Sequence, residues 1–368
     1  MMSQHLKYMA RALQLAARGL FTTDPNPRVG CILVLDDKVV GEGYHQRAGE
    51  AHAEINALKV AGKNAAGADC YVTLEPCNHT GRTPPCVDAL IAAGIRRVFV
   101  AMEDPNPVVS GSGIEHLRSA GITVETGMLA EEAKLLNIGF CKRMSLGRPY
   151  VRCKLAMSLD GRTAMDSGES QWITGAAARL DVQKLRAASS AILTGVGTVL
   201  ADDPALTVRP EEGGWYPDGQ VIRQPLRVVV DSQQRTPLNA QLFSHAGAVL
   251  IASTQADHNY PKAETLVLPS SNGQVDLSAL MAHLAQREIN ELLVEAGAVL
   301  NGSLLRAGLI DELIIYMAPK LMGDAARGLL HLPGLETMKQ NIDLDIMDIR
   351  SVGQDWRILV KPVTSATA

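Results

Sequence analysis

Residues 73–86 read TLEPCNHTGRTPPC, and a second short stretch, residues 52–54, reads HAE. Together the two stretches supply one imidazole, from His52, and two thiols, from Cys77 and Cys86. One histidine and two cysteines form a zinc site with the fourth coordination position left for water, which is the catalytic rather than the structural arrangement of this metal. The sequence therefore predicts a catalytic centre with one Zn²⁺ per chain.

Glu54 lies two residues beyond His52, where it can sit beside the metal without binding it. Zinc acidifies its bound water, and Glu54 would take the proton from that water and deliver it to a ring nitrogen and a departing amine. A single cysteine is more often a buried core residue. The order His-x-Glu, Pro-Cys, Cys is instead the signature of zinc nucleobase deaminases. We therefore expect deamination of a pyrimidine-type ring.

The spacing of the two cysteines departs from that signature. The nucleobase deaminases carry Pro-Cys-x-x-Cys, whereas eight residues separate Cys77 from Cys86 here. The longer loop counts against a plain cytidine or tRNA-adenosine deaminase. His79 in this loop is an alternative ligand, although a loop residue that faces substrate or solvent is the commoner case.

Around these motifs, sequence patterns typical of helices alternate along the chain with patterns typical of strands. Apolar periodicity predicts helices at 8–18, 52–60 and 86–93, and strands at 29–35, 38–44, 70–74 and 97–102, the first two as a hairpin. Such alternation is typical of an α/β sandwich with a partly parallel sheet. A linker at 143–149 precedes a second series with strands at 150–155, 191–193, 227–230, 248–252, 291–294 and 312–317, and a surface loop at 210–224. We expect two domains, 1–146 and 147–368.

The charge composition of the chain indicates which kinds of molecule the protein binds. The 368 residues contain 35 Lys and Arg against 39 Asp and Glu, a net charge of −4, whereas nucleic-acid binders show a basic excess. The sequence favours small-molecule substrates. It has neither an apolar signal core at its start nor an apolar run of about 20 residues, so we expect a cytoplasmic protein without membrane contact. Thiols stay reduced there, and the six cysteines are not read as a disulfide framework.

The chain resembles the bacterial bifunctional riboflavin-biosynthesis deaminase/reductase family, often called RibD or RibG. The matching stretches lie at 26–31, 52–54, 73–86, 104–107, 154–162, 170–174, 198–209 and 294–297. The long spacing between the two cysteines belongs to this family's pattern. The resemblance implies an N-terminal cytidine-deaminase-like α/β/α sandwich and a C-terminal dihydrofolate-reductase-like α/β domain.

The resemblance also implies two reactions. The first is zinc-dependent deamination of 2,5-diamino-6-ribosylamino-4(3H)-pyrimidinone 5′-phosphate. The second is NADPH-dependent reduction of the ribosyl side chain, which gives 5-amino-6-ribitylamino-uracil 5′-phosphate. In the family pattern His52, Cys77 and Cys86 hold zinc, Glu54 shuttles the proton, and Asn26, His45 and Asn106 contact the pyrimidine. Family members associate through the reductase half, so a homodimer is expected.

The reductase half carries weaker signals of its own. Gly195-x-Gly197 follows a strand, but no third glycine completes a dinucleotide fingerprint. Small residues at 297–303 would let backbone amides approach a phosphate. The family pattern implies substrate contacts from Lys154, Ser170, Arg186, Leu206, Arg209 and Glu295. It implies NADPH contacts from Ala156, Trp172, Thr198, Asp202, Ser232, Gly297, Ala298, Val299, Leu300, Asn301, Gly302 and Ser303. The cation that reads the 2′-phosphate of NADPH stays open.

The sequence argues against two other functions. A nucleic-acid base deaminase would need a basic, aromatic surface for stacking, yet aromatic residues make up only 4% of the chain. A zinc-stabilised binding module without chemistry predicts a closed site with four ligands. The sequence offers three good ligands and an acid placed to act as a base.

Overall fold

The computed structural model describes residues 2–78, 84–107, 109–209, 214–216, 219 and 221–363. His79 and part of the predicted loop at 210–224 lie outside these residues. The chain divides into two compact units, Met1–Gly147 and Arg148–Ala368. Among the described residues, no helix combines the length and the apolar character that a membrane crossing requires.

The first unit is built on a five-stranded sheet with the order β2-β1-β3-β4-β5. Strand β1 pairs antiparallel with both β2 and β3, and β3, β4 and β5 run parallel. The predicted hairpin and the partly parallel sheet are therefore confirmed. The strands are β1 (Gly30–Leu35), β2 (Lys38–Tyr44), β3 (Asp69–Val72), β4 (Arg97–Val100) and β5 (Thr123–Thr126).

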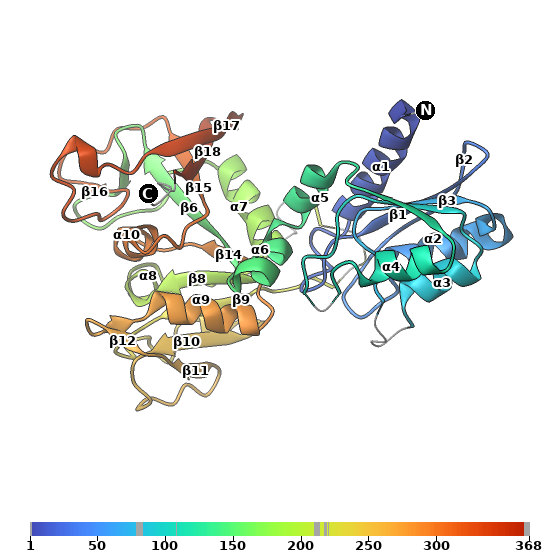
Figure 1. Ribbon diagram of the computed structural model, residues 1–368. Coiled ribbons are helices and arrows are strands. Elements are labelled where there is room, and N and C mark those ends of the chain that lie inside the picture. Colours follow the sequence, from blue (N-terminus) through green and yellow to red (C-terminus); the bar gives the residue numbers. More distant parts are fainter. Residues whose placement is uncertain are drawn as a thin grey trace. The chain divides into compact units, whose positions relative to one another are not determined.

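Helices cover both faces of this sheet (Figure 1). Successive side chains of a strand point to opposite faces. Cys31 and Leu33 of β1 accordingly join one buried cluster, and Ile32 and Val34 join the other. The first face carries α2 (Ala53–Ala61), α3 (Cys86–Ala92) and α4 (Ser112–Ser119), and the second carries α1 (Met2–Ala17) and α5 (Ala130–Leu136); η1 (Gly62–Ala65) and α6 (Ile138–Leu146) complete the unit. This is the predicted three-layer α/β/α sandwich.

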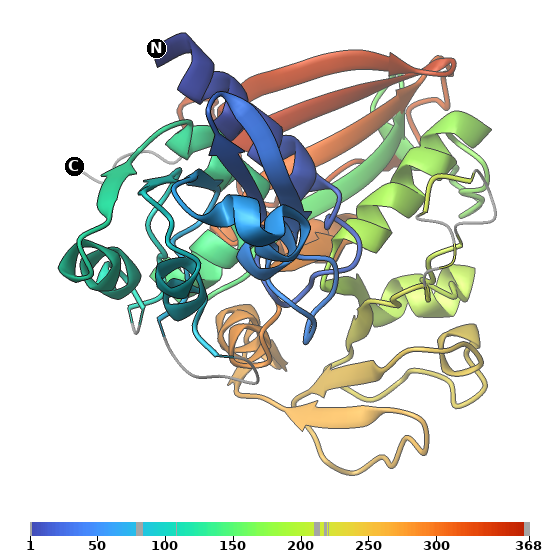
Figure 2. The same ribbon diagram turned by 90° about the vertical axis from the view of Figure 1, so that its right-hand side faces the viewer.

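The second unit contains a nine-stranded sheet with the order β11-β10-β9-β8-β14-β6-β15-β18-β17. From β11 to β15 every neighbouring pair is parallel, and the antiparallel strands β18 and β17 extend the sheet beyond β15 (Figure 2). The strands are β6 (Tyr150–Ser158), β8 (Ala191–Gly195), β9 (Leu226–Val230), β10 (Val249–Ser253), β11 (Glu264–Val267), β14 (Glu291–Val294), β15 (Glu312–Ala318), β17 (Leu344–Val352) and β18 (Asp355–Pro362).

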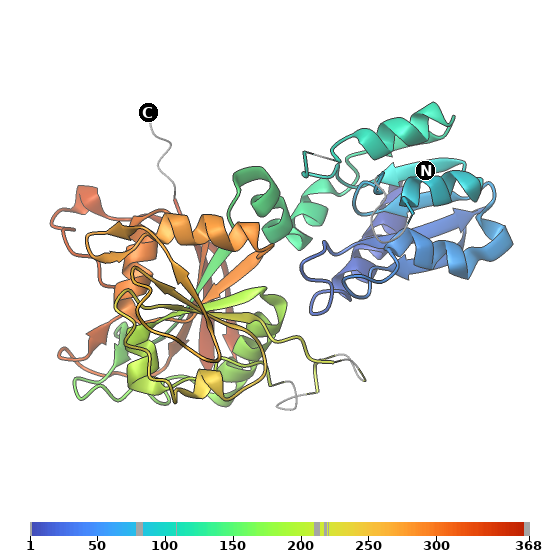
Figure 3. The same ribbon diagram turned by 90° about the horizontal axis from the view of Figure 1, so that it is seen from below.

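The helices of the second unit also lie on both faces of their sheet (Figure 3). Residues of β15 alternate between the two sides, since Ile314 and Tyr316 pack against α7 while Leu313 and Ile315 join the cluster of α9 and α10. One face carries α7 (Ala176–Ala188) and α8 (Val196–Asp202), and the other carries α9 (Leu277–Gln286) and α10 (Ala298–Arg306). Short pieces are β7 (Arg162–Ala164), β16 (Arg327–Gly328), β12 (Ser270–Ser271), β13 (Gln274–Val275), η3 (Gln241–Phe243) and η4 (Met338–Gln340).

The order of the strands fixes where a ligand can bind in this unit. Strands β9, β8, β14 and β6 are successive neighbours and run parallel, so their carboxyl ends meet at one edge of the sheet. Open α/β sheets bind ligands at that edge. The segments that follow these strands therefore gather in one place although they lie far apart in the sequence.

Candidate functional site

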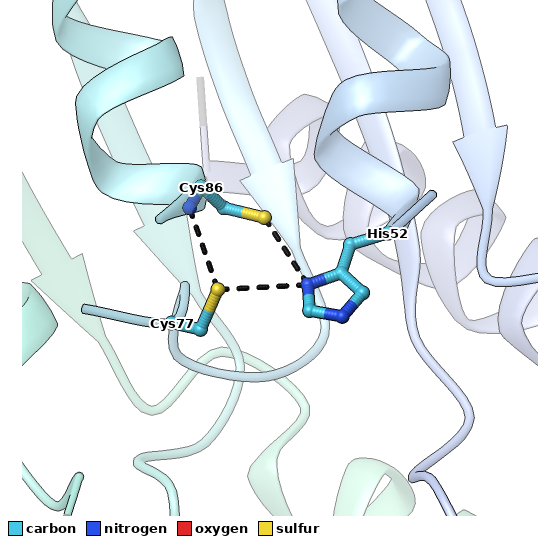
Figure 4. Close-up of side chains that lie close together, drawn as sticks. All are labelled: His52, Cys77 and Cys86. Carbon is cyan, nitrogen blue, oxygen red and sulfur yellow. Dashed lines mark hydrogen bonds between the residues drawn. The ribbon is translucent and has the colours of Figure 1, made fainter. Parts of the chain in front are cut away.

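The side chains of His52, Cys77 and Cys86 converge in the first unit (Figure 4). Their nitrogen and sulfur atoms all lie within 4.8 Å of one another. His52 immediately precedes α2, Cys77 lies in the loop after β3, and Cys86 is the first residue of α3. Among the described residues, this is the group of His, Cys, Asp and Glu side chains whose atoms could share one metal ion.

The spacing of these three atoms suits zinc. His52 Nδ1 lies 3.3 Å from Cys86 Sγ and 3.5 Å from Cys77 Sγ. Ligand atoms bound tetrahedrally at 2.0–2.3 Å from zinc lie about 3.5–3.8 Å apart. The backbone N–H of Cys86 donates to Cys77 Sγ at 3.4 Å and helps to fix the second thiol. The donor set of one nitrogen and two sulfur atoms is also one that zinc prefers.

The electrostatics of the cluster favour an ionised sulfur next to an acid that is partly protonated at neutral pH. The contact with Cys86, together with the contact to His52, lowers the pKa of the Cys77 thiol to about 4. Glu54 is only 3% exposed, and this burial raises the pKa of its carboxyl to about 7. A carboxyl with such a pKa can both accept and return a proton at neutral pH.

Asn26 and His45 form a hydrogen-bonded pair beside the cluster. Asn26 Nδ2 lies 3.0 Å from His45 Nε2, and His45 Nδ1 lies 3.2 Å from the carbonyl oxygen of Ala51. Burial lowers the pKa of His45, so the ring is neutral, donates to Ala51 through Nδ1 and accepts from Asn26 through Nε2. The His45 ring meets the His52 ring edge-on at 5.4 Å between centroids. Two of the three predicted pyrimidine contacts therefore lie next to a predicted zinc ligand.

Asn106, the third predicted contact, belongs to a loop that Glu75 holds. The Glu75 carboxylate accepts hydrogen bonds from the backbone N–H groups of four residues at 2.8–3.3 Å: Asp104, Gly111, Gly113 and Ile114. A Cβ on Gly113 would lie 2.2 Å from the carbonyl oxygen of Pro76, so only glycine fits this close approach. Glu75 thus ties the segment of Asn106 to the segment of Cys77.

Sequence reasoning gave Glu75 no role, and it also missed Asn137. The Asn137 side chain accepts from the Arg28 N–H at 2.8 Å and donates to the Arg28 carbonyl at 2.9 Å, which fixes the chain just after Asn26. Both residues act through partners 29 to 109 positions away. The motif Leu74-Glu75-Pro76-Cys77 was the one available signal, and only for Glu75.

In the second unit, Arg186 forms an ion pair with Glu295 where β14 ends, and the charge of Lys154 acts on the same carboxylate. Arg186 donates to both oxygens of Glu295, at 2.6 and 3.0 Å, and to the carbonyl of Thr207. Burial raises the pKa of Glu295, but Arg186, Lys154 and Arg209 outweigh burial and lower it. Burial lowers the pKa of Lys154. Three basic side chains thus surround one carboxylate, which leaves net positive charge for an anionic substrate.

Ser170 and Leu206, two further predicted substrate residues, lie in different environments. Ser170 Oγ lies 3.2 Å from Asp202 Oδ1, which joins a substrate candidate to a cofactor candidate. Leu206 is 3% exposed and packs with Ile192 and Leu293, so its side chain belongs to the core and only its backbone can meet a ligand.

The predicted cofactor residues line the same edge of the sheet. Ala156 belongs to β6, and Ser232 follows the end of β9. Trp172 is 63% exposed, with the Arg179 guanidinium 4.7 Å from its ring centroid. Thr198 of α8 approaches Gly297, since a Cβ there would lie 3.8 Å from Thr198 Oγ1.

The segment 297–303 divides into two parts. Gly297 immediately precedes α10, Ala298 and Val299 are its first two residues, and Val299 is 66% exposed. Asn301 is fully buried and donates to the carbonyl of Ala296 at 2.8 Å. A Cβ on Gly302 would lie 2.0 Å from the carbonyl oxygen of His331. Leu300 packs against Gly195, and the Ser303 hydroxyl bonds to Val299 within the helix. The start of α10 can thus face a ligand, whereas Asn301 and Gly302 pack within the unit.

The comparisons with known proteins agree with this architecture. Residues 2–102 match the cytidine and deoxycytidylate deaminase zinc-binding region, and residues 149–358 match the RibD C-terminal domain. Riboflavin biosynthesis protein RibD of Escherichia coli (strain K12) is 56% identical over 95% of this chain and 96% of its own length, and that of Haemophilus influenzae is 50% identical over 98% of each.

Two solved structures extend the likeness along the whole chain. Acinetobacter baumannii RibD superposes with a TM-score of 0.92 at 44% identity, covering 99% of this chain and all of its own. A Thermotoga maritima protein described as a diaminohydroxyphosphoribosylaminopyrimidine deaminase/5-amino-6-(5-phosphoribosylamino)uracil reductase gives 0.87 at 32% identity, covering 98% and 99%.

The fold and the site define an enzyme in which a zinc-dependent deaminase domain is joined to an NADPH-dependent reductase domain. The chain belongs to the RibD family and is a bifunctional enzyme of riboflavin biosynthesis. The family assignment sets aside the nucleic-acid base deaminase and the binding module without chemistry.

Proposed function

We propose that residues 1–146 remove the 2-amino group of 2,5-diamino-6-ribosylamino-4(3H)-pyrimidinone 5′-phosphate, and that residues 147–368 then reduce the ribosyl side chain with NADPH to give 5-amino-6-ribitylamino-uracil 5′-phosphate. The observation that carries the first half is the convergence of His52, Cys77 and Cys86 beside a buried acid. The basic cluster around Glu295 supports the second half, because the product of deamination keeps its phosphate.

In the deaminase unit, His52, Cys77 and Cys86 would hold zinc and Glu54 would move the proton. When bound, zinc supplies a Lewis acid that makes water a nucleophile near neutral pH. Glu54 accepts a proton and returns it to the ring nitrogen and the leaving amine, a role that its raised pKa suits. Asn26 orients the pyrimidine through the amide oxygen that it does not turn toward His45.

The second proposed pyrimidine anchor is Asn106. Asp104 Oδ1 accepts from the Asn106 N–H at 2.8 Å, and Glu75 holds the N–H of Asp104 in turn. Two amide side chains from separate loops would therefore hold the ring. Orientation of this kind accelerates a reaction because the bound reactants no longer have to find the productive geometry.

In the reductase unit, the sheet edge would hold both the sugar phosphate and the nicotinamide. Lys154, Arg186 and Arg209 attract the phosphate, while Glu295 keeps Arg186 in place. Ser170, Asp202 and Trp172 border the ribosyl chain and the cofactor. The protein's part is to hold the hydride donor over the first carbon of the opened sugar.

The deaminase half is tested with the purified, zinc-loaded protein and the diaminopyrimidine ribosyl phosphate alone. We expect stoichiometric release of ammonia and a product one mass unit heavier, with no NADPH present. Absence of ammonia while metal analysis finds one zinc per chain would contradict the proposed substrate. A screen of other aminated rings on the same protein would then identify the class of compound that it takes.

We also propose that the protein is a cytoplasmic homodimer. All six cysteines are unpaired, as the reduced state of that compartment requires. Strand β17 ends the nine-stranded sheet, and Ile346, Met347 and Ile349 on it are 50–64% exposed. A long exposed edge strand can pair with another chain, and most homo-oligomers are two-fold symmetric. Light scattering should give twice the chain mass, and Ile349→Lys should reduce it to that of one chain.

A further inference from the structure

Residues 203–209 follow α8 and belong to no helix or strand. Side chains from elsewhere in the second unit nevertheless bond to the main chain of this segment. Gln183 Oε1 accepts from the N–H of Arg209 at 2.9 Å, and Arg186 donates to the carbonyl oxygen of Thr207 at 3.0 Å. Both side chains belong to α7 and are three positions apart, so they lie on one face of that helix.

Gln224 bonds to the same segment at Val208. Its amide oxygen accepts from the Val208 N–H at 2.9 Å, and its amide nitrogen donates to the Val208 carbonyl oxygen at 3.0 Å. Thr207 and Arg209 are thus bonded by α7, and Val208 is bonded by Gln224. A strand inside a sheet shows the same alternation between its two neighbours. Side chains here take the place of neighbouring strands and fix the main chain as far as Arg209.

The start of the segment is fixed by packing. Leu206 has a φ of +51°, in the left-handed region that few residues other than glycine adopt. Its side chain is 3% exposed and packs with Ile192 and Leu293. Such a conformation persists where the surrounding structure holds it. The chain therefore leaves Leu206 in a defined direction, and the contacts that follow determine where Arg209 lies.

Gln183 differs from the other buried residues of its helix. It is 2% exposed, and the other buried positions of α7 are the apolar Ala178, Val182 and Ala187. Burial of an amide is unfavourable unless the amide is hydrogen-bonded. An apolar residue of the same size would fill this position without that cost. The hydrogen bond to the Arg209 N–H is what a glutamine adds here.

We propose that Gln183 and Gln224 are positioning residues of the reductase, which hold the main chain so that the Arg209 guanidinium meets the phosphate of the substrate. The inference rests on the proposed function of Arg209. The charge of Arg209 acts on Glu295, so the guanidinium lies near the basic cluster around that carboxylate. A displacement of about 1 Å in a contact that orients the substrate can lower a rate substantially. Loss of either glutamine should therefore weaken the hold of Arg209 on the substrate.

The test measures reductase kinetics of the full-length protein with the deaminated substrate and saturating NADPH. Methionine has nearly the size of glutamine but no amide, and it replaces one residue in Gln183→Met and the other in Gln224→Met. We expect each substitution to raise KM for the substrate several-fold, and by no more than Arg209→Ala does, while KM for NADPH stays unchanged. The control Lys184→Met, at the exposed neighbouring position of α7, should keep the wild-type KM.

The combination with Arg209→Ala separates a positioning role from a structural one. A residue that acts through Arg209 has no further effect once Arg209 is removed, whereas independent effects add. We therefore expect both methionine substitutions to leave the KM of Arg209→Ala unchanged. The dephosphorylated substrate lacks the group that Arg209 binds. It should be reduced with the same kcat/KM by the wild type and by both glutamine variants.

Three results would each overturn the inference: an unchanged KM in the glutamine variants, a further rise of KM in the Arg209→Ala background, or an equal loss with the dephosphorylated substrate. Because the two glutamines hold the segment from separate places in the chain, one folded variant is enough for the test. Failure of the proposed function is seen separately, in wild-type protein that oxidises no NADPH or in an Arg209→Ala protein with the wild-type KM.

Discussion

The residues of the two sites are spread over very different lengths of sequence. In the first, three atoms that suit zinc come from two short stretches, 52–54 and 77–86, and lie within 4.8 Å of one another. In the second, the proposed contacts lie in or near β6, β8, β9 and β14, between residues 154 and 303. A metal centre is specified by a few strong ligands at fixed spacing, whereas a nucleotide site is specified by the order of strands. The difference should appear as different sensitivities to single substitutions.

The largest effect is expected in the metal centre, where one ligand removes the whole site. Cys77→Ser should lose zinc and reduce deamination below detection, because two remaining ligands do not hold the metal. Reduction of the deaminated substrate should continue at the wild-type rate. Metal analysis and the two separate assays measure this, with Cys141→Ser as the control, since Cys141 lies outside the cluster. A Cys77→Ser protein with full zinc content would break the ligand assignment.

The next largest effect is expected for Glu54, the acid beside the three metal ligands. Glu54→Gln should keep zinc and lower kcat for deamination about 10²- to 10⁴-fold, the usual contribution of a positioned acid–base group. Glu50→Gln, a change on the exposed side of the preceding turn, serves as the control. Loss of zinc in Glu54→Gln would turn Glu54 into a structural element of the site and remove its proposed role.

A substitution at Glu295 in the reductase unit should lower the stability of the protein as well as its reductase rate. Glu295→Gln leaves Arg186 without its partner in a pair that is only 11–12% exposed, so we expect a loss of about 3 kcal/mol in unfolding free energy. The matched change Glu264→Gln breaks an exposed pair with Arg287 and should cost below about 1 kcal/mol. Equal effects of the two substitutions, measured by denaturant unfolding, would show that burial does not strengthen the pair.

The same variant gives a pH dependence with a definite sign. The folded pKa of Glu295 is lowered from its ordinary value of 4.5. Its contribution to stability is therefore complete above pH 4.5 and is lost as the pH falls through the lower folded value. The stability difference between wild type and Glu295→Gln should shrink toward acid pH, and a difference that grows there would contradict the assignment.

A smaller effect is expected where a residue acts through the loop that it holds. Glu75→Gln should retain zinc, raise KM for the pyrimidine about 10-fold and cost about 1–3 kcal/mol in stability, since the anionic acceptor for four N–H groups is lost. Glu115→Gln on the exposed side of α4 is the control. An unchanged KM with lower stability would leave Glu75 a purely structural role.

The smallest effect is expected for one of several cations. Arg209→Ala should raise KM for the reductase substrate several-fold and spare deamination, because Lys154 and Arg186 remain near the phosphate. Both kinetic constants are measured with the deaminated substrate and saturating NADPH. Unchanged reductase kinetics would remove Arg209 from the phosphate site.

The sequence predicted most of the elements around the metal centre because local patterns specify them. The positions of His52 and Cys86 at helix starts were both visible in the periodicity, although α2 begins one residue later than predicted, at Ala53. Strands β17 and β18 were not predicted. Strand β17 is exposed along nearly its whole length, so its residues lack the alternation of a strand with one buried face. The position of β14 between β8 and β6 in the sheet also could not be predicted from any local sequence pattern.

The same physical reason separates the site residues that could be predicted from those that could not. Glu75 and Asn137 act on backbone groups that are distant in sequence. Leu206 and Asn301 follow the family pattern, yet their side chains are buried, which only the packing could show.

The most direct test of two separate sites that act in a fixed order follows ammonia release and NADPH oxidation in one reaction. With wild-type protein and the diaminopyrimidine ribosyl phosphate, ammonia should appear first, and NADPH oxidation should begin after a lag and reach one equivalent. With Glu54→Gln the rate of NADPH oxidation should fall by the factor lost in deamination, and added deaminated substrate should restore the wild-type rate. Prompt NADPH oxidation by Glu54→Gln without added deaminated substrate would contradict the account.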